Sequence, residues 1–393
     1  MAGSVPELSG LGVLTWMYPP GLVDRVVAAC GRTEQRTRLL PARLTVYFVL
    51  ALALFSPAPY LEVLRQLTEG LRGMGLWGSW RLPVKSSLFR ARDRLGSQPL
   101  RMLFAATAGP VGPVGMPGVF WRGLRLMAVD GTCWDVADTA VNEAAFGRPG
   151  TTRGQGRAAF PQVRMVALAE SGTHALCDAE IAGCRVGETV LAGRLTRSVA
   201  PGMLVLADRE FLGVPLWQAF TATGAHLLWR VPANRILEVE QVLADGSWLS
   251  RMYAAGDRPG RRRPTRVRVL AYHLDDPGRP GRQEGYRLVT DLLDSTAYPA
   301  AELAVLYTQR WEEETTLAEI KRYQRGAGVV LASKTPEGVR QQVWAHLLVH
   351  RALRALMCQT ARSAGVDCDR LSFTDTLRAV RRSVTAAAGV FSP

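Results

Sequence analysis

Apolar side chains recur at intervals of three and four residues over the first hundred positions, which is the spacing of amphipathic helices. The apolar stretch 44–55, between Arg43 and Pro57, is too short to cross a bilayer and predicts a buried helix. Shorter runs with helical spacing lie on both sides of it, at Leu22, Val23, Val26 and Val27 and at Leu61, Val63, Leu64 and Leu67. We therefore predict a helical N-terminal domain over residues 1–108. Ser86 and Ser87 predict the start of a helix whose basic face carries Arg90, Arg92 and Arg94. A basic helical domain suits binding of DNA ends, and a solvated helix face is the alternative.

The hydrophobic pattern changes after residues 109–118, which are rich in Gly and Pro and predict a linker. Two short apolar runs then predict buried strands, one ending at Asp130 and the other at Asp208. The elements predicted in this part are the strands 124–129 and 203–207, a hairpin formed by 163–168 and 175–181, and a helix over 188–199. Two core strands are thus expected to end in an aspartate.

Residues 231–290 differ from their surroundings, because alternating strand-like pieces are separated there by Gly, Pro and Arg clusters. We interpret this segment as a β-rich insertion, and helical patterns return at 299–327 and 336–358. The predicted class is α/β. The predicted regions are a helical N-terminal domain at 1–108, a catalytic core at 119–230 and 291–335, the β-rich insertion at 231–290 and a C-terminal helical region at 336–393.

The formal charge of +14 makes a polyanionic partner plausible, although an arginine-rich composition with only three lysines explains part of it. The six cysteines are scattered without a CxxC pair, so they indicate neither a zinc site nor a disulfide framework. No secretory signal is evident at the N-terminus. We expect a cytoplasmic, nucleoid-associated protein without a membrane segment.

Asp130 and Asp208 suggest metal-assisted phosphoryl transfer. Magnesium and manganese prefer hard oxygen ligands, and two such ions can activate the attacking hydroxyl and stabilise the leaving oxygen. A carboxylate at the end of a rigid strand is well placed for this role. Each aspartate alone is weak support, because strand-end aspartates more often form turns or cap helices. A third carboxylate is therefore needed.

Glu314 is the candidate for that third carboxylate. Tyr307, Arg310, Glu314 and Lys321 are separated by 3, 4 and 7 residues, so on a regular α-helix they share one face. The alternative is an exposed helix crossed by ion pairs. Trp311 argues against that alternative, because a large aromatic is an unusual choice for a solvated stripe.

The spacing Tyr-x-x-Arg-x-x-x-Glu-x-x-x-x-x-x-Lys from Tyr307 to Lys321 resembles the signature of the insertion sequence 4 family of bacterial transposases. Other stretches similar to that family are Ala128-Val129-Asp130-Gly131-Thr132 with Asp138, Asn142 and Phe146-Gly147, then Asp208-Arg209-Glu210-Phe211, Leu39-Leu40-Pro41-Ala42-Arg43 and Arg94-Leu95-Gly96. The resemblance covers nearly the whole chain. It implies an RNase H-like catalytic core with a β-rich insertion before the glutamate.

The resemblance also implies residue roles. Asp130, Asp208 and Glu314 become the catalytic, metal-binding triad for two Mg²⁺ or Mn²⁺ ions. The implied DNA contacts are Tyr307, Arg310 and Lys321, the neighbouring Arg209, and two aromatics for a flipped base, Trp311 and Tyr286. Tyr286 stands where a relative carries tryptophan, which leaves a hairpin route open.

The expected function is therefore a cut-and-paste DNA transposase. It would bind terminal inverted repeats, cleave double-stranded DNA at the transposon ends and join the 3′-hydroxyl to target DNA, as a homodimer in the DNA complex. Two alternatives remain open: a transposase-derived DNA-binding protein without catalysis, and a metal-dependent nuclease that cannot join strands.

Overall fold

Helices make up the described N-terminal part of the chain. The computed structural model describes residues 12–36, 40–72, 83–150, 156–254, 263–273, 285–308, 316–326 and 328–385. The helices before the sheet are α1 (Gly12–Met17), α2 (Pro20–Ala29), α3 (Ala42–Leu54), α4 (Tyr60–Arg72), α5 (Lys85–Leu95) and α6 (Gln98–Thr107). Ten of the thirteen residues of α3 are buried, which confirms the buried helix predicted over 44–55.

A mixed sheet follows, with ten strands in the described chain and the order β4-β3-β2-β5-β6-β10-β9-β8-β7, β1 pairing with β2. Its strands are β1 (Phe120–Trp121), β2 (Leu124–Asp135), β3 (Gln162–Glu170), β4 (Ala175–Gly183), β5 (Met203–Ala207), β6 (His226–Arg230), β7 (Gln241–Val242), β8 (Trp248–Met252), β9 (Thr265–Tyr272) and β10 (Tyr286–Thr290). Strands β2, β5 and β6 run parallel and every other pairing is antiparallel. The predicted β-rich segment thus contributes strands that continue the main sheet, because β10 pairs directly with β6. The proposed domain boundaries stay a prediction.

Different helices cover the two faces of the sheet. One face packs against α8 (Glu188–Arg194) and α9 (Val214–Thr221) through residues such as Val129 and Val205. The opposite face carries α10 (Ala300–Thr308) over the middle of the sheet, and α12 (Pro336–Ala364) over β3 and β4. The remaining elements are α7 (Ala140–Phe146), η1 (Ser171–Thr173), η2 (Leu195–Ser198), η3 (Arg209–Phe211), the π-helix η5 (Glu319–Gln324), η6 (Cys368–Arg370) and α13 (Phe373–Thr385).

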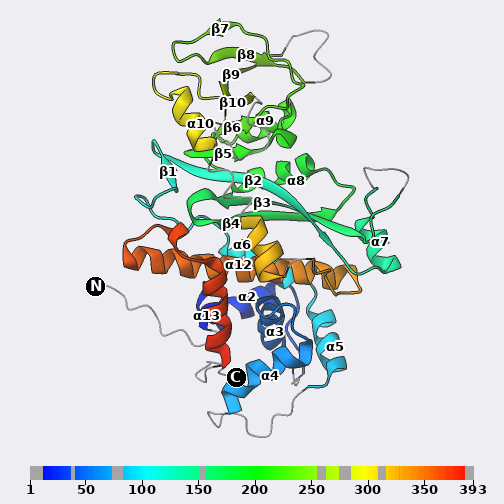
Figure 1. Ribbon diagram of the computed structural model, residues 1–393. Coiled ribbons are helices and arrows are strands. Elements are labelled where there is room, and N and C mark those ends of the chain that lie inside the picture. The colour runs from blue at the N-terminus through cyan, green and yellow to red at the C-terminus, as the bar shows by residue number, and fades with distance from the viewer. Residues whose placement is uncertain are drawn as a thin grey trace.

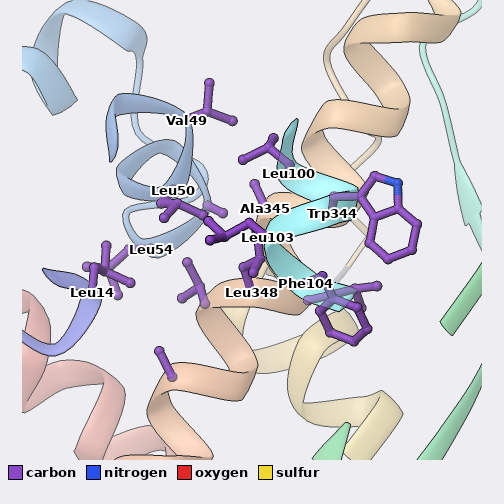
Figure 2. Packing of buried hydrophobic residues seen from close by; sticks show 14 of the residues in the cluster. Leu14, Val49, Leu50, Leu54, Leu100, Leu103, Phe104, Trp344, Ala345 and Leu348 are labelled. Atoms are coloured by element: carbon purple, nitrogen blue, oxygen red, sulfur yellow. The ribbon is translucent and has the colours of Figure 1, made fainter. Parts of the chain in front are cut away.

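Helix α12 joins the N-terminal helices to the sheet. It lies between them in Figure 1, and nineteen of its residues are buried. In Figure 2, Ala345 and Leu348 of α12 lie near apolar side chains of α3 and α6, and the Trp344 ring lies beside Phe104 of α6. Neither α12 nor any other helix of the described segments is long and apolar enough to cross a bilayer. One apolar core therefore extends from the N-terminal helices through α12 to the sheet, and the mixed α/β class is confirmed.

Polar contacts from the first turns of α12 also fix the N-terminal helices. The Glu337 carboxylate accepts hydrogen bonds from the Ser97 backbone N–H at 2.6 Å and from its hydroxyl at 2.8 Å, at the start of α6. The Gln341 side-chain amide donates to the carbonyls of Arg92 and Gly96 at the end of α5. These bonds satisfy helix-end groups that would otherwise lack partners. They give α5 and α6 a defined orientation on α12.

Leu348→Ala is expected to lower the free energy of unfolding by roughly 2 to 5 kcal/mol, because Leu348 is fully buried and its truncation leaves a cavity. Urea unfolding measures the change. Leu61→Ala makes the same substitution on α4, where the side chain is 47% exposed, and should cost less than about 1 kcal/mol. Equal losses in the two variants would contradict the central role of α12.

Candidate active site

The register between β2 and β5 brings Asp130 and Asp208 together. These strands are parallel neighbours, and Val129 lies opposite Ala207 at the end of their pairing. Each aspartate is the next residue of its strand path, so the two carboxylates follow adjacent parallel strands. The prediction that Asp130 ends its strand is wrong, because β2 continues to Asp135 and Asp130 pairs with Ala167 of β3. β2 continues because its other neighbour, β3, extends past the end of β5.

Both carboxylates lie on the face that α10 and α12 cover. Side chains alternate along a strand, so Asp130 follows Ala128 and Asp208 follows Leu206 on one side of the sheet. Ala128 and Leu206 pack in the apolar cluster beneath α10, while Ala167, opposite Asp130, packs in the cluster that includes α12. The aspartate pair thus lies where these two clusters meet. The segment from α10 to α12, which carries Glu314 in sequence, connects the same two helices.

The surroundings of Asp208 bear on whether its carboxylate can bind a ligand. Its Oδ1 is buried and has no hydrogen bond within the described parts of the chain. Arg230 Nη1, at the end of β6, lies 4.0 Å from this oxygen. Asp130 Oδ1 accepts a hydrogen bond from the Gly131 backbone N–H at 2.8 Å. A buried oxygen of this kind is normally satisfied, so Asp208 is suited to a ligand.

The site suits a divalent cation in its donor chemistry. Two adjacent carboxylates supply the hard oxygen ligands that Mg²⁺ and Mn²⁺ use. Asp208 Oδ1, which accepts no hydrogen bond from the described residues, is suited to coordinate such an ion. In the described segments no group of three or more His, Cys, Asp or Glu residues is arranged to hold a metal. The third predicted ligand, Glu314, lies outside the described residues, as do Arg310 and Trp311.

Tyr307 is buried at the end of α10, with only 3% of its surface exposed. Its hydroxyl donates a hydrogen bond to the carbonyl of Ala207 at 3.1 Å. Ala207 directly precedes Asp208, so this bond fixes α10 against the strand end that presents the second aspartate. Tyr307 therefore helps to hold the strand end that carries Asp208. Its burial differs from the exposed position expected of a side chain that contacts DNA, so its role as a DNA contact stays a prediction.

Lys321 lies in a different helical geometry from the one assumed in the sequence argument. It is exposed on η5, a π-helix, whereas Tyr307 belongs to the α-helix α10. A regular α-helix therefore does not reach Lys321, and the shared face of Tyr307, Arg310, Glu314 and Lys321 stays a prediction, because Arg310 and Glu314 lie outside the described residues. A π-turn contains more residues per turn than an α-turn, which changes the angular position of each side chain. Arg209 is exposed on η3, directly after Asp208.

A row of planar side chains extends across the sheet from Asp208. The Arg230 guanidinium lies 4.5 Å from the centre of the Tyr286 ring, and Tyr286 stacks on Tyr272 with 5.5 Å between ring centres. The pairing of Leu288 with Arg230 places this row on the same face as the aspartates. Sequence reasoning missed Arg230. Its signal was an apolar strand ending in a charged residue, as at both aspartates.

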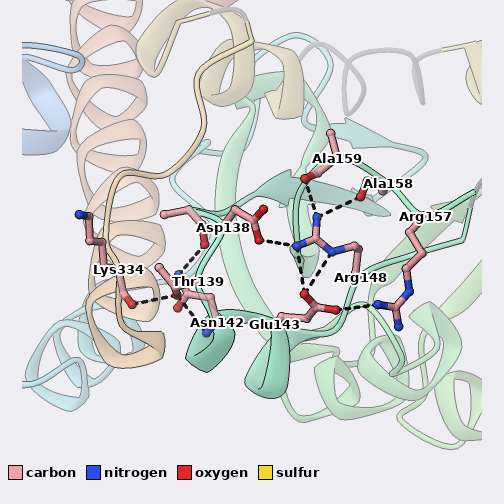
Figure 3. A network of polar contacts seen from close by, with 10 residues as sticks. Asp138, Thr139, Asn142, Glu143, Arg148, Arg157, Ala158, Ala159 and Lys334 are labelled. Carbon is pink, nitrogen blue, oxygen red and sulfur yellow. Dashed lines mark hydrogen bonds and ion pairs between the residues drawn. The ribbon is translucent and has the colours of Figure 1, made fainter.

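The chain after Asp130 is fastened to the chain after Lys321. Figure 3 shows Arg148 between Asp138 and Glu143, with Glu143 also bound to Arg157. Asn142 is fully buried, and its amide donates to the carbonyls of Ala137 and Ser333 at 3.0 Å. An isolated β-bridge between Val136 and Leu331 reinforces this junction. These contacts therefore join the segment that follows the first aspartate to the segment that follows the predicted glutamate.

Comparison with known protein families matches two models in succession. Residues 8–105 match the family described as insertion element 4 transposase N-terminal. Residues 121–351, more than half of the chain, match the family described as transposase DDE domain. The boundary between the two matches falls between α6 and β1, where the sheet begins.

Individual relatives agree with these matches. Two proteins of Escherichia coli (strain K12) are similar: transposase InsG for insertion sequence element IS4, 29% identical over 94% of this chain and 82% of its own length, and the putative transposase InsZ, 27% identical over 57% and 72%. Among solved structures, the cryo-EM piggyBac transposase synaptic complex with hairpin DNA has a similar fold. Its TM-score is 0.50 at 12% identity, covering 96% of this chain and 80% of that one.

DDE transposases are catalytic, act on DNA and use divalent metal ions. The side-by-side aspartates of β2 and β5 agree with that chemistry, as do the helical N-terminal part and the mixed sheet. The N-terminal family match precedes the DDE-domain match along the chain, and the InsG alignment covers 94% of the chain. This chain belongs to the insertion sequence 4 family of DDE transposases.

Proposed function

We propose that this transposase binds terminal inverted repeats, cleaves the DNA at both transposon ends and joins the freed 3′-hydroxyl to target DNA. Asp130, Asp208 and Glu314 form its catalytic triad in this proposal. The observation that carries it is the parallel register of β2 and β5, which brings two carboxylates together on one face of the sheet. Cleavage and joining are both phosphoryl transfers, so one site serves both steps.

The three carboxylates would hold two Mg²⁺ or Mn²⁺ ions. When bound, such ions supply an activated attacking hydroxyl and stabilise charge on the leaving oxygen. The chain itself holds the carboxylates still: the Tyr307 hydroxyl binds the carbonyl before Asp208, and the Gly131 amide binds Asp130. A rigid arrangement of this kind reduces the reorganisation that the reaction requires.

Cationic and aromatic side chains around the site are the proposed DNA contacts. Lys321 and Arg209 are exposed on the elements next to the proposed triad, and Arg230 and Tyr286 extend from Asp208 across the sheet. Guanidinium and ammonium groups bind phosphates, and aromatic rings stack on unpaired bases. Arg310 and Trp311, close to Glu314 in sequence, complete the proposed contacts.

We further propose that the active form in the DNA complex is a homodimer, because both ends of one element must be cut and joined together. The solved piggyBac structure carries the name synaptic complex, which supports the same arrangement here. Sedimentation of the protein with terminal-repeat DNA tests it. A species with one protein and one end, at concentrations that support joining, would contradict the dimer.

The decisive assay uses terminal-repeat DNA in Mg²⁺, with intact ends for cleavage and precut ends for joining. The proposed function requires both activities. Binding without cleavage in several divalent metals would favour a transposase-derived DNA-binding protein. Cleavage without joining of precut ends would favour a metal-dependent nuclease.

For the second strand we propose a DNA hairpin on the transposon end. Tyr286 supplies an aromatic ring on the face of the aspartates, and the piggyBac structure contains hairpin DNA, which supports this route. The flipped base that a hairpin requires would pack on Tyr286 once the flexible Arg230 side chain moves aside.

Tyr286→Ala is expected to slow hairpin formation by about 5- to 150-fold, the equivalent of roughly 1–3 kcal/mol for one stacked base. First-strand nicking should stay within about twofold, because it precedes base flipping. Denaturing gels of end-labelled DNA separate the nick from the hairpin. Tyr286→Trp keeps an aromatic ring and should restore the hairpin step. Hairpin formation at the wild-type rate in the alanine variant would remove Tyr286 from this role.

A further inference from the structure

A buried ion-pair cluster fastens the segment that follows Glu314 to α12. Glu319, on η5, is only 3% exposed. Its Oε2 accepts hydrogen bonds from His350 Nε2 and from Arg354 Nε, each at 2.9 Å, and its Oε1 pairs with Arg354 Nη2. We call Glu319, His350 and Arg354 the Glu319 triad. A carboxylate that binds an arginine in a bidentate manner and also binds an imidazole has little freedom to move.

The position of Glu319 in the chain links this cluster to the active site. It stands five residues after Glu314 and two residues before Lys321. Side chains two positions apart on a helix point in roughly opposite directions. Accordingly, Glu319 is buried against α12 while Lys321 is exposed. Glu319, which binds α12, and Lys321, the proposed DNA contact, therefore lie on opposite sides of the same helical turn.

The groups around Glu319 favour its charged form. Burial pushes its pKa up, but the His350 hydrogen bond and the Arg354 charge outweigh burial and hold the pKa below its usual range. Phe373 of α13 packs against the His350 ring and the Arg354 guanidinium, and His174, paired with Asp369 at 3.1 Å, adds another group nearby. A charged group so enclosed requires its partners, because losing them leaves an uncompensated buried charge.

Other contacts hold the same segment. Leu317 and Ile320 pack in the large apolar cluster, where contact is non-directional. The end of η5 is fixed through backbone carbonyls: Arg381 donates to Gln324 at 3.2 Å and Ser56 donates to Arg325 at 3.1 Å. Glu319 adds a charged, directional contact in the half of η5 that is nearer to Glu314 in sequence.

We propose that Glu319 is a positioning residue: its contact with Arg354 and His350 sets the placement of the chain that presents the Glu314 carboxylate and the Lys321 ammonium. This inference rests on the proposed role of Glu314. Groups that orient metal ligands without touching the metal commonly change metal affinity or activity by about 10- to 100-fold when they are removed. The Glu319 triad therefore serves the reaction as well as the stability of the fold.

The test compares three variants of the full-length protein: Glu319→Gln, Glu314→Gln as the reference for the catalytic assignment, and Glu170→Gln as a matched control. Glu170 is also a fully buried carboxylate paired with an arginine, Arg125. It ends β3 and lies outside the segment that carries Glu314 and Glu319. Each variant is measured for its unfolding midpoint, its binding of terminal-repeat DNA, its affinity for Mn²⁺ by electron paramagnetic resonance and its single-turnover cleavage rate.

Glu319→Gln is expected to bind Mn²⁺ about 10-fold more weakly and to cleave about 10- to 100-fold more slowly, with DNA binding within about threefold of wild type. Glu170→Gln should lose a similar amount of stability yet keep Mn²⁺ affinity and cleavage within about twofold. Wild-type Mn²⁺ affinity and cleavage in Glu319→Gln, beside an inactive Glu314→Gln, would overturn the inference alone. An active Glu314→Gln would instead overturn the proposed function.

A second variant separates positioning from stability. Replacing a buried ion pair by apolar residues of similar size often preserves stability, so the double variant E319M/R354M is expected to unfold near the wild-type midpoint. It should still cleave at least about 10-fold more slowly, because no directional contact is restored. Full cleavage by the double variant would assign the pair to stability only. If Glu319→Gln fails to fold, Glu319→Asp replaces it. This variant keeps the charge but has a shorter side chain, and the same measurements and criteria apply to it.

Discussion

Replacing Asp130, Asp208 or Glu314 with alanine is expected to reduce both end cleavage and strand joining by on the order of 10⁴-fold. When catalytic groups act as one unit, removing one of them costs nearly as much activity as removing them all. The reason lies in the parallel register of β2 and β5, which makes the first two carboxylates neighbours. Removing either one takes away oxygen ligands that no adjacent described side chain replaces. Binding of terminal-repeat DNA should stay within about threefold of wild type.

Asp135→Asn is the matched control for this prediction. Asp135 is on the same strand, five residues beyond Asp130, and its Oδ1 accepts a hydrogen bond from the Gln162 side chain at 2.8 Å. Asparagine retains an acceptor there, so cleavage should stay within about threefold. Full cleavage by any one of the three alanine variants would remove that residue from the triad. Loss of DNA binding together with cleavage would point instead to misfolding.

Asp245→Ala is expected to lower the free energy of unfolding by roughly 1 to 3 kcal/mol, because it leaves the buried guanidinium of Arg268 without one of its acceptors and without its counter-charge. Arg268 is fully buried on β9 and is paired with Asp245. It also donates to the Ser247 hydroxyl at 2.7 Å and to the Tyr298 carbonyl at 2.6 Å. Asp245 in turn accepts from the Ala300 backbone N–H at 2.8 Å, at the start of α10.

This pair joins the outer strands of the sheet to the helix that carries Tyr307, so its loss should also reduce cleavage. Urea unfolding measures the stability, and Glu302→Ala is the control. Glu302 pairs with Arg122 on the surface, with both side chains more than 40% exposed, and its loss should change the stability much less than the loss of Asp245. Equal losses in the two variants would contradict the special role of the contact with buried Arg268.

The Asp245 contribution should depend on pH in one direction. Burial raises its pKa, but hydrogen bonds from Ser247 and Ala300 and the charge of Arg268 lower it more, so the pKa falls below its usual value. A carboxyl group with a lowered folded-state pKa stabilises the protein above its unfolded pKa of about 3.9 and loses that effect as pH falls through the folded-state value. The stability difference between wild type and Asp245→Asn should therefore be constant from about pH 5 to 8 and shrink below about pH 4.

Much of the architecture could be predicted from local patterns. The runs that end at Asp130 and Asp208 are short and rich in Leu, Val, Met and Ala, so they predicted buried strands that the structure confirms as β2 and β5. The alternation in residues 231–290 likewise indicated strands. Local pattern could not reveal that these strands extend the main sheet, because pairing of β10 with β6 joins residues about sixty positions apart.

The sequence by itself determined the periodicities, the order of the elements and the identity of the candidate carboxylates, because each depends on neighbouring residues and on motif spacing. Only the tertiary structure decided which groups meet. The β2–β5 register makes the two aspartates neighbours, the Tyr307 hydroxyl donates to the buried carbonyl of Ala207, and Lys321 lies in a π-helix and not in the regular α-helix that the spacing assumed. No motif singled out Glu319, which packing against α12 buries beside Arg354. Burial and long-range pairing set these roles, since both depend on residues far apart in the chain.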